Sequence, residues 1–178
     1  MTDYFELLGV PRSLNLSLDE LQKSYYDLSR QLHPDRFMQK PEAERQRALD
    51  MSSALNDAYR TLKDPIKRAQ YLLTLGGFDV GEQRSKDVPP ELLEEVFELN
   101  MALEEMRSGD ESARPQIEQA EKTFTNMLAE TDGQLEALFG QYDTARSRDV
   151  LVEIRNVLNR RKYIQNLVSE VEKTLIPS

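Results

Sequence analysis

Apolar residues recur at helical spacing along almost the whole chain, and no segment alternates apolar and polar residues as a half-buried strand would. The clearest stripe has spacings of 3, 4, 3 and 4 and consists of Leu18, Leu21, Tyr25, Leu28 and Leu32. A stripe of this kind predicts a helix that buries one face. The sequence therefore predicts an all-α protein whose helices bury apolar faces against one another.

Proline and glycine divide the first part of the chain into four predicted helices. These cover about residues 3–8, 18–32, 41–63 and 65–75. Ser17 is expected to cap the second helix, with Glu20 completing a capping box. The third helix is expected to bury Ala48, Met51, Leu55, Ala58, Tyr59 and Leu62. We place a first domain at residues 1–75, followed by a linker at residues 76–89 that is marked by Gly76-Gly77 and later prolines.

Residues 90–178 contain three longer helical patterns, which we assign to a second domain. They run from about 91 to 107, from about 113 to Gly140, and from about 146 to 175. Asp132-Gly133 interrupts the second pattern, and we expect the helix to continue through it. Three helices with short connections predict an antiparallel three-helix bundle.

The composition excludes several kinds of site. The chain has no cysteine and one histidine, which excludes disulfides, thiolate or His-rich metal sites and a cysteine nucleophile. We therefore expect no metal and no cofactor. No apolar run is long enough to span a bilayer, and the first residues lack the features of a signal or transit peptide. These features favour a protein of a reducing, aqueous compartment.

The charge is unevenly distributed. Residues 1–75 hold 11 basic and 11 acidic side chains, whereas residues 76–178 hold 12 basic and 21 acidic ones, a net charge of −9. An acidic chain repels phosphate backbones, so nucleic acid is not an expected partner. The acidic part could instead be attracted to a basic protein surface.

The helix predicted at residues 91–107 has two apolar faces. One stripe, suited to docking in a bundle, consists of Leu92, Val96, Leu99, Leu103 and Met106. A second row, formed by Leu93, Phe97 and Met101, lies away from it and is flanked by Glu94, Glu98 and Glu105. A wide core face could accommodate Leu93, but not Met101, which lies nearly opposite the stripe. We favour an exposed apolar row with an acidic margin, which is typical of a protein interface. Tyr163 on the last helix also falls off its core stripe.

The only histidine lies in His33-Pro34-Asp35, where Pro34 ends the preceding helix because it lacks an N–H. The loop allows three interpretations. His33 could act as a general base oriented by Asp35, but no nucleophile elbow or glycine-rich oxyanion loop accompanies it. The pair could instead cap the helix end and a turn. The third interpretation is recognition of a partner by a rigidly held loop.

The sequence around this loop resembles the J-domain family. The run Asp3-Tyr4-Phe5-Glu6-Leu7-Leu8-Gly9-Val10 resembles the opening helix of that family, and Leu55-Asn56-Asp57-Ala58-Tyr59-Arg60-Thr61-Leu62-Lys63-Asp64-Pro65 resembles the end of its third helix. The segments Arg68-Ala69-Gln70-Tyr71-Leu72-Leu73 and Gly77-Phe78 are similar to one subfamily, the HscB-type co-chaperones of iron–sulfur cluster assembly. An acidic three-helix C-terminal domain is also the arrangement of that subfamily.

The resemblance implies that the first domain docks on a DnaK-type chaperone ATPase, one like HscA, and stimulates its ATP hydrolysis. The docking residues that it implies are His33, Pro34 and Asp35 in the loop, with Lys23, Arg30 and Arg36 as basic support. Tyr26 and Asp27 depart from the family pattern because other J-domains often carry cations at these positions.

The resemblance also implies that the second domain binds an IscU-type scaffold, on which the cluster is built. The positions that correspond to the scaffold-binding surface of the family are Leu93, Phe97, Glu98, Met101, Glu105 and Tyr163. Two positions depart from the family pattern: Glu94 replaces an often apolar residue, and Met101 stands where an acidic residue is frequent.

The sequence thus predicts a non-enzymatic co-chaperone that joins a scaffold to a chaperone ATPase, with no nucleic acid or membrane partner. The main alternative is a J-domain protein whose helical tail binds another client. A hydrolase using His33 and Asp35, and a purely structural adaptor, are further alternatives. The chain lacks the N-terminal cysteine-rich module that eukaryotic members often add, so we expect a bacterial cytoplasmic protein rather than one of the mitochondrial matrix.

Overall fold

The computed structural model describes residues 3–79 and 88–176, and within these ranges every regular element is a helix, which confirms the all-α prediction. Residues 80–87 of the predicted linker lie outside the described residues. The described chain divides into two compact units. The first comprises residues 3–79 with 142–145, and the second comprises residues 88–141 with 146–176.

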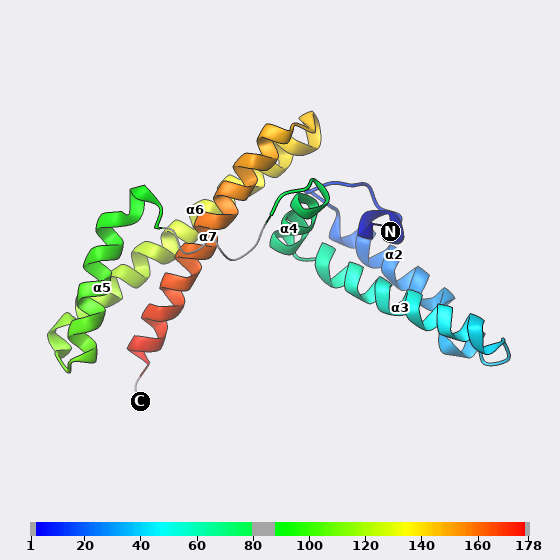
Figure 1. Ribbon diagram of the computed structural model, residues 1–178, viewed down its shortest axis with the longest axis horizontal. Coiled ribbons are helices and arrows are strands. Elements are labelled where there is room, and N and C mark those ends of the chain that lie inside the picture. Colours follow the sequence, from blue (N-terminus) through cyan, green and yellow to red (C-terminus); the bar gives the residue numbers. More distant parts are fainter. Residues whose placement is uncertain (1–2, 80–87, 177–178) are drawn as a thin grey trace. The chain divides into compact units, whose positions relative to one another are not determined.

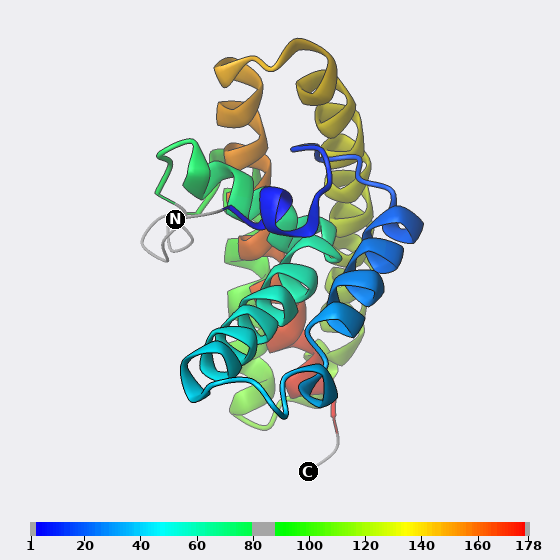
Figure 2. The ribbon, with the colours of Figure 1, turned by 90° about the vertical axis from the view of Figure 1, so that its right-hand side faces the viewer.

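The first unit is built around a helical hairpin. Its elements are α1 (Tyr4–Leu8), α2 (Leu18–Gln31), the short 3-10 helix η1 (Pro34–Arg36), α3 (Glu42–Leu62) and α4 (Pro65–Leu75). Helices α2 and α3 run antiparallel and side by side, and the loop that joins them lies at one end of the pair (Figure 1, Figure 2). Helix α1 packs on both of them, and α4 packs on α3. The loop that contains His33 therefore lies at the tip of a rigid hairpin.

Side-chain caps define the beginnings of three of these helices. Asp3 accepts the Glu6 N–H at the start of α1, and Asp64 accepts the N–H groups of Ile66 and Lys67 at the start of α4. Ser17 accepts the Glu20 N–H, as the capping-box pattern predicts for α2. The caps occupy amide donors that the first helical turn leaves without a partner.

The apolar positions that helical spacing predicts in the first unit are buried or half-buried, with two exceptions. Its fully buried side chains include Phe5, Leu8, Leu21, Leu55, Leu62 and Leu73. Leu18 and Met51 were predicted to be buried, but they are 52% and 45% exposed. Periodicity gives the direction of a side chain around the helix axis, but not how far the neighbouring helices extend along that axis.

Polar side chains hold the loop of residues 13–15 in the first unit. The buried Arg68 donates from Nε to the Leu62 carbonyl at 2.8 Å and from Nη1 to the Leu14 carbonyl at 2.6 Å. The Asp143 carboxylate accepts the N–H groups of Leu14 and Asn15, each at 2.8 Å. Both backbone polar groups of Leu14 are therefore satisfied, as buried backbone requires.

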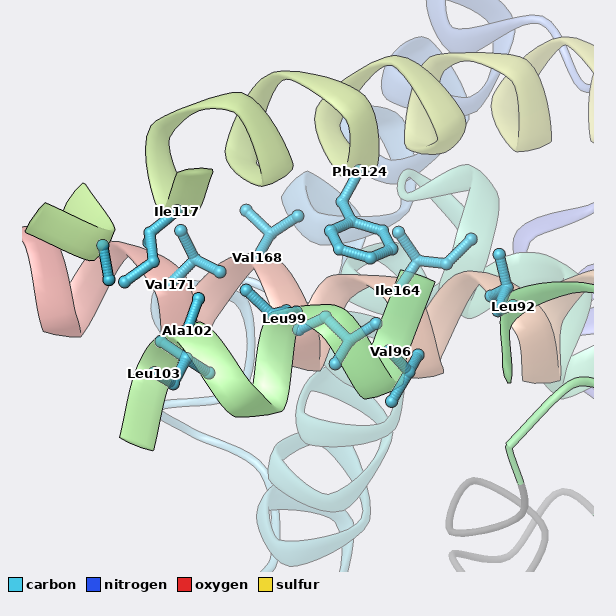
Figure 3. Packing of buried hydrophobic residues seen from close by; sticks show 12 residues of the cluster. Leu92, Val96, Leu99, Ala102, Leu103, Ile117, Phe124, Ile164, Val168 and Val171 are labelled. Carbon is cyan, nitrogen blue, oxygen red and sulfur yellow. The ribbon is translucent and has the colours of Figure 1, made fainter. Parts of the chain in front are cut away.

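The second unit is the three-helix bundle that the sequence predicts. It contains η3 (Pro90–Leu92), α5 (Leu93–Arg107), η4 (Glu111–Ala113), α6 (Arg114–Ala145, whose last four residues belong to the first unit) and α7 (Arg148–Leu175). Its core lies where the three helices face one another, with Phe124 of α6 directed toward Ile164 of α7 (Figure 3). The core cluster consists of Leu92, Val96, Leu99, Ala102, Leu103, Ala113, Ile117, Phe124, Ile164, Leu167, Val168 and Val171.

Helix α6 is longer than predicted. It continues through Asp132-Gly133, as expected, but the prediction that Gly140 ends it was wrong, because it runs to Ala145. Glycine in a helix interior costs about 1 kcal/mol relative to alanine, which packing can outweigh. Leu135, Leu138 and Phe139 are buried just before Gly140, so tertiary packing maintains the helix across the glycine.

Candidate functional site

The loop between α2 and α3 presents its side chains on an ordered backbone. Helix α2 ends at Gln31, and His33 has the extended conformation (φ −57°, ψ 135°) that a following proline favours. The Arg36 N–H donates to the His33 carbonyl at 2.9 Å, and the Phe37 N–H donates to the Pro34 carbonyl at 3.0 Å. These bonds fix one short 3-10 turn, which holds the tripeptide in a defined shape.

The His33 and Asp35 side chains are 60% and 79% exposed. The Asp35 N–H donates to Nδ1 of His33 at 3.2 Å, so the neutral imidazole carries its proton on Nε2. Both Nε2 and the carboxylate remain accessible to another molecule. Because His33 and Asp35 are exposed to solvent, the loop does not shield a reaction from water, which disfavours the catalytic interpretation. The same exposure allows the pair to contact the surface of another protein.

The three predicted basic residues lie near this loop along the chain, and all are exposed. Lys23 and Arg30 lie on one face of α2, because seven residues make nearly two helical turns. Arg30 lies 3.8 Å from Asp27, a distance typical of a weak surface pair, and Arg36 belongs to η1. The structure therefore places one basic residue in the loop and two on the helix that leads to it.

Helix α5 carries the second predicted surface. Leu93, Phe97 and Met101 are 57%, 66% and 50% exposed, which confirms that they form a row outside the core. Glu98 and Glu105 are exposed on the same helix, as is Glu94. Three large apolar side chains left in solvent on one helix, with carboxylates beside them, form the pattern that the sequence analysis expects of a protein interface.

The position of Tyr163 differs from the predicted one, which was off the core. It is only partly exposed and packs against the core cluster of the second unit. Burial raises the pKa of its hydroxyl, and the negative charge of Glu170 raises it further. Glu170 also accepts from Arg107 at 2.8 Å, which joins α7 to α5. Helical spacing did not reveal the pair of Arg107 and Glu170, because these residues lie on different helices.

The sequence also did not predict an apolar cavity beside the loop. It is lined by Leu32, Pro34, Phe37, Met38, Arg45, Ala48 and Leu49. The available signal was the apolar pair Phe37-Met38, which follows the tripeptide and Arg36. Periodicity gave no reason to examine that pair, because it lies outside the α-helices.

Two further features of residues 3–79 and 88–176 bear on other functions. No group of three or more histidine or acidic side chains in these ranges could hold a metal ion. None of the helices there combines the length and apolar character needed to cross a membrane.

Two protein families match consecutive parts of the chain. The DnaJ domain family matches residues 3–71, which include α1 to α3, the loop and part of α4. The family described as "HSCB C-terminal oligomerisation domain" matches residues 88–172, which include the exposed row on α5.

Solved structures resemble the whole chain. The chaperone HscB from Vibrio cholerae is 30% identical, with a TM-score of 0.63, over 97% of this chain and 96% of that one. The human co-chaperone protein HscB is 28% identical, with a TM-score of 0.68, over 100% of this chain and 84% of that one. With both domains matched in order and a relative aligned along nearly its full length, the chain belongs to the HscB family of J-domain co-chaperones of iron–sulfur cluster assembly.

Proposed function

We propose that this protein joins an IscU-type scaffold to a DnaK-type, HscA-like chaperone ATPase and stimulates ATP hydrolysis by that ATPase. The observation that carries the proposal is the exposed His33-Pro34-Asp35 loop at the tip of a helical hairpin, in a chain that matches the HscB family over both domains. The chemistry belongs to the partner. This protein acts by binding and is not itself an enzyme.

The loop is the contact with the ATPase. The Asp35 carboxylate meets an arginine of the partner, and a charge-assisted pair of this kind is among the stronger polar contacts. Pro34 and the 3-10 turn fix the carboxylate, so little conformational freedom is lost on binding. Lys23, Arg30 and Arg36 contribute attraction to acidic parts of the ATPase.

The scaffold binds to the row on α5. Phe97 is the central anchor, because it is the most exposed of the three apolar side chains and lies between Leu93 and Met101 on the same helix face. Glu98 and Glu105 form a polar rim. Tyr163 contributes through its exposed part, and its buried part fixes its position. The scaffold carries the cluster, since this chain has no cysteine to hold one.

Joining both partners through one chain raises the effective concentration of the scaffold at the ATPase. That effect requires two binding surfaces but no new chemistry. A bacterial cytoplasmic setting fits the proposal, because the substrate cluster is assembled and transferred in a reducing compartment.

The test is steady-state ATP turnover by an HscA-like ATPase, with and without this protein and the scaffold. Turnover should rise with this protein and rise further with the scaffold, whereas His33→Gln should abolish the stimulation and keep the helical circular dichroism spectrum. Normal stimulation by a folded His33→Gln protein would contradict the assignment of the loop as the ATPase contact, and no stimulation by the wild type would support a purely structural adaptor.

The second candidate function is a J-domain protein that serves another client. It is favoured by the two departures on α5, Glu94 and Met101, which alter the surface relative to the family pattern. Calorimetric titration of this protein with an IscU-type scaffold distinguishes the two. No heat of binding, together with normal ATPase stimulation, would support the other client.

A further inference from the structure

A cavity of about 310 Å³ lies directly beside the His33-Pro34-Asp35 loop in the first unit. Its lining combines the end of α2, the loop and the first half of α3. The lining residues are Leu32, Pro34, Phe37, Met38, Arg45, Ala48 and Leu49. Six of the seven side chains are apolar, and the volume is at the lower end of the range for protein pockets that hold ligands. We call it the loop groove.

The loop groove includes large apolar side chains that are exposed to solvent. Met38 and Leu49 are 69% and 56% exposed, whereas Ala48 is buried and Phe37 is partly buried. The apolar surface thus continues from the core of the hairpin to its outer surface. When a partner covers apolar surface that was exposed to water, the free energy falls, so such a surface favours binding.

The groove carries one charged side chain. Arg45 is exposed at its edge, and in the part of the chain that the structure describes it forms no ion pair. Among the positions three or four residues from Arg45 in sequence, Glu42 is the one acidic residue, and no ion pair joins the two. A guanidinium at the edge of an apolar pocket suits an apolar group that has a carboxylate next to it.

The position of the groove identifies its occupant. Leu32 and Pro34 line the groove and also flank or form the tripeptide loop, so a protein surface that contacts His33 and Asp35 lies next to the groove. We propose that the loop groove receives an apolar side chain of the same DnaK-type ATPase, with Arg45 paired to an acidic residue beside that side chain. The inference rests on the proposed function, and it adds a binding pocket and the chemistry of its ligand.

Two exposed apolar residues of α3 provide a matched test. Leu49 lines the groove, whereas Met51, two residues later on the same helix, does not line it. Leu49→Gln should raise by about tenfold or more the concentration of this protein that gives half-maximal ATPase stimulation, because a buried leucine contributes on this scale. Met51→Gln should leave that concentration unchanged. Maximal stimulation should be retained in both, since the loop is intact.

Arg45→Gln tests the charged part of the proposal. At low salt it should raise several-fold the concentration of this protein that gives half-maximal stimulation. It should also make that concentration depend less on salt, because one ion pair with the partner is lost. A variant with the salt dependence of the wild type would overturn the assignment of Arg45. Equal behaviour of Leu49→Gln and Met51→Gln would overturn the assignment of the groove.

The two levels of inference fail in different ways. If the wild type stimulates the ATPase, His33→Gln does not, and Leu49→Gln behaves like Met51→Gln, the groove proposal is overturned and the proposed function stands. If the wild type gives no stimulation, the proposed function and the groove proposal are overturned together. Self-association that Leu49→Gln abolishes, measured by analytical ultracentrifugation, would identify a second copy as the occupant and overturn the proposal.

Discussion

Nδ1 of His33 accepts the backbone N–H of Asp35 at 3.2 Å, and a carboxylate oxygen of the same Asp35 lies 3.6 Å from that nitrogen. Nδ1 cannot accept the amide hydrogen and donate to the carboxylate at the same time. While Nδ1 accepts the amide hydrogen, it does not donate to the Asp35 carboxylate, which is 79% exposed. A carboxylate in this state is available to a cation on a partner.

Asp35→Asn is expected to abolish stimulation of the chaperone ATPase without changing the fold. The substitution keeps the size of the side chain but removes its charge, and the side chain is 79% exposed, so packing is not disturbed. Turnover of ATP at saturating concentrations of this protein measures the effect. Asp50→Asn is the matched control, because Asp50 is an exposed carboxylate on α3 outside the loop, and it should stimulate normally.

Phe97→Ala is expected to weaken binding of the scaffold by about 2 kcal/mol, the scale of an anchor residue at a protein interface. Phe97 is 66% exposed, so the truncation leaves the bundle core intact. Isothermal titration calorimetry with the scaffold gives the change. Ile176→Ala is a control with the same exposed fraction of 66% at the end of α7. Equal affinities of Phe97→Ala and the wild type would remove Phe97 from the interface.

Local rules predicted most of the fold. Proline, glycine and capping residues identified nearly all the helix ends, and the predicted cap at Ser17 is present in the structure. The failures involve tertiary packing. Met51 has the correct spacing but lies exposed, and Gly140 is a local stop signal that the packing around Phe139 overrides.

The candidate sites were predictable to different degrees. The apolar row on α5 was visible because its residues share one helix and fail to fit the core stripe. The contacts of Tyr163 and the loop groove join residues from different elements, and no spacing along one helix reveals them. The assignment of the loop itself came from its resemblance to a family, because the residues alone left three interpretations open.

Asp3→Asn is expected to destabilise the first unit at neutral pH and to reduce its sensitivity to acid. Burial acts to raise the pKa of the Asp3 carboxyl, but the Glu6 amide and the Arg12 guanidinium outweigh it, so the pKa lies below 3.8. The stabilisation by the carboxylate is therefore fully present above its ordinary pKa, and it is lost as the pH falls through the lowered value. Asparagine can still cap the helix, so what is lost is the negative charge at the helix start and the ion pair with Arg12, together about 1 kcal/mol.

Urea titrations between about pH 6 and pH 2 test this prediction. The Tyr4 and Tyr71 rings stack 4.5 Å apart beside Asp3, so near-ultraviolet circular dichroism of tyrosine reports on this region. The difference in stability between wild type and Asp3→Asn should shrink toward acid pH. A constant difference over the whole range would show that ionisation of Asp3 does not stabilise the unit.

Arg68→Met is expected to destabilise the first unit by about 2–3 kcal/mol, because it removes donors to two buried carbonyl groups. Arg68 is 4% exposed and donates to the carbonyls of Leu62 and Leu14. Burial lowers the pKa of its guanidinium, opposed by the charges of Asp64 and Asp143. Lys67→Met, at the neighbouring exposed position, is the control and should change the urea midpoint little. Equal midpoints for the two variants would contradict the role of Arg68.

The central claim is that one chain must carry both the ATPase contact and the scaffold contact. ATP turnover by the chaperone in the presence of scaffold tests it with His33→Gln, Phe97→Ala and an equimolar mixture of the two. Tethering by a single molecule predicts that the mixture does not regain the additional stimulation that the scaffold gives with wild-type protein. Full recovery by the mixture would contradict the claim, since two separate molecules would then supply what one is proposed to supply.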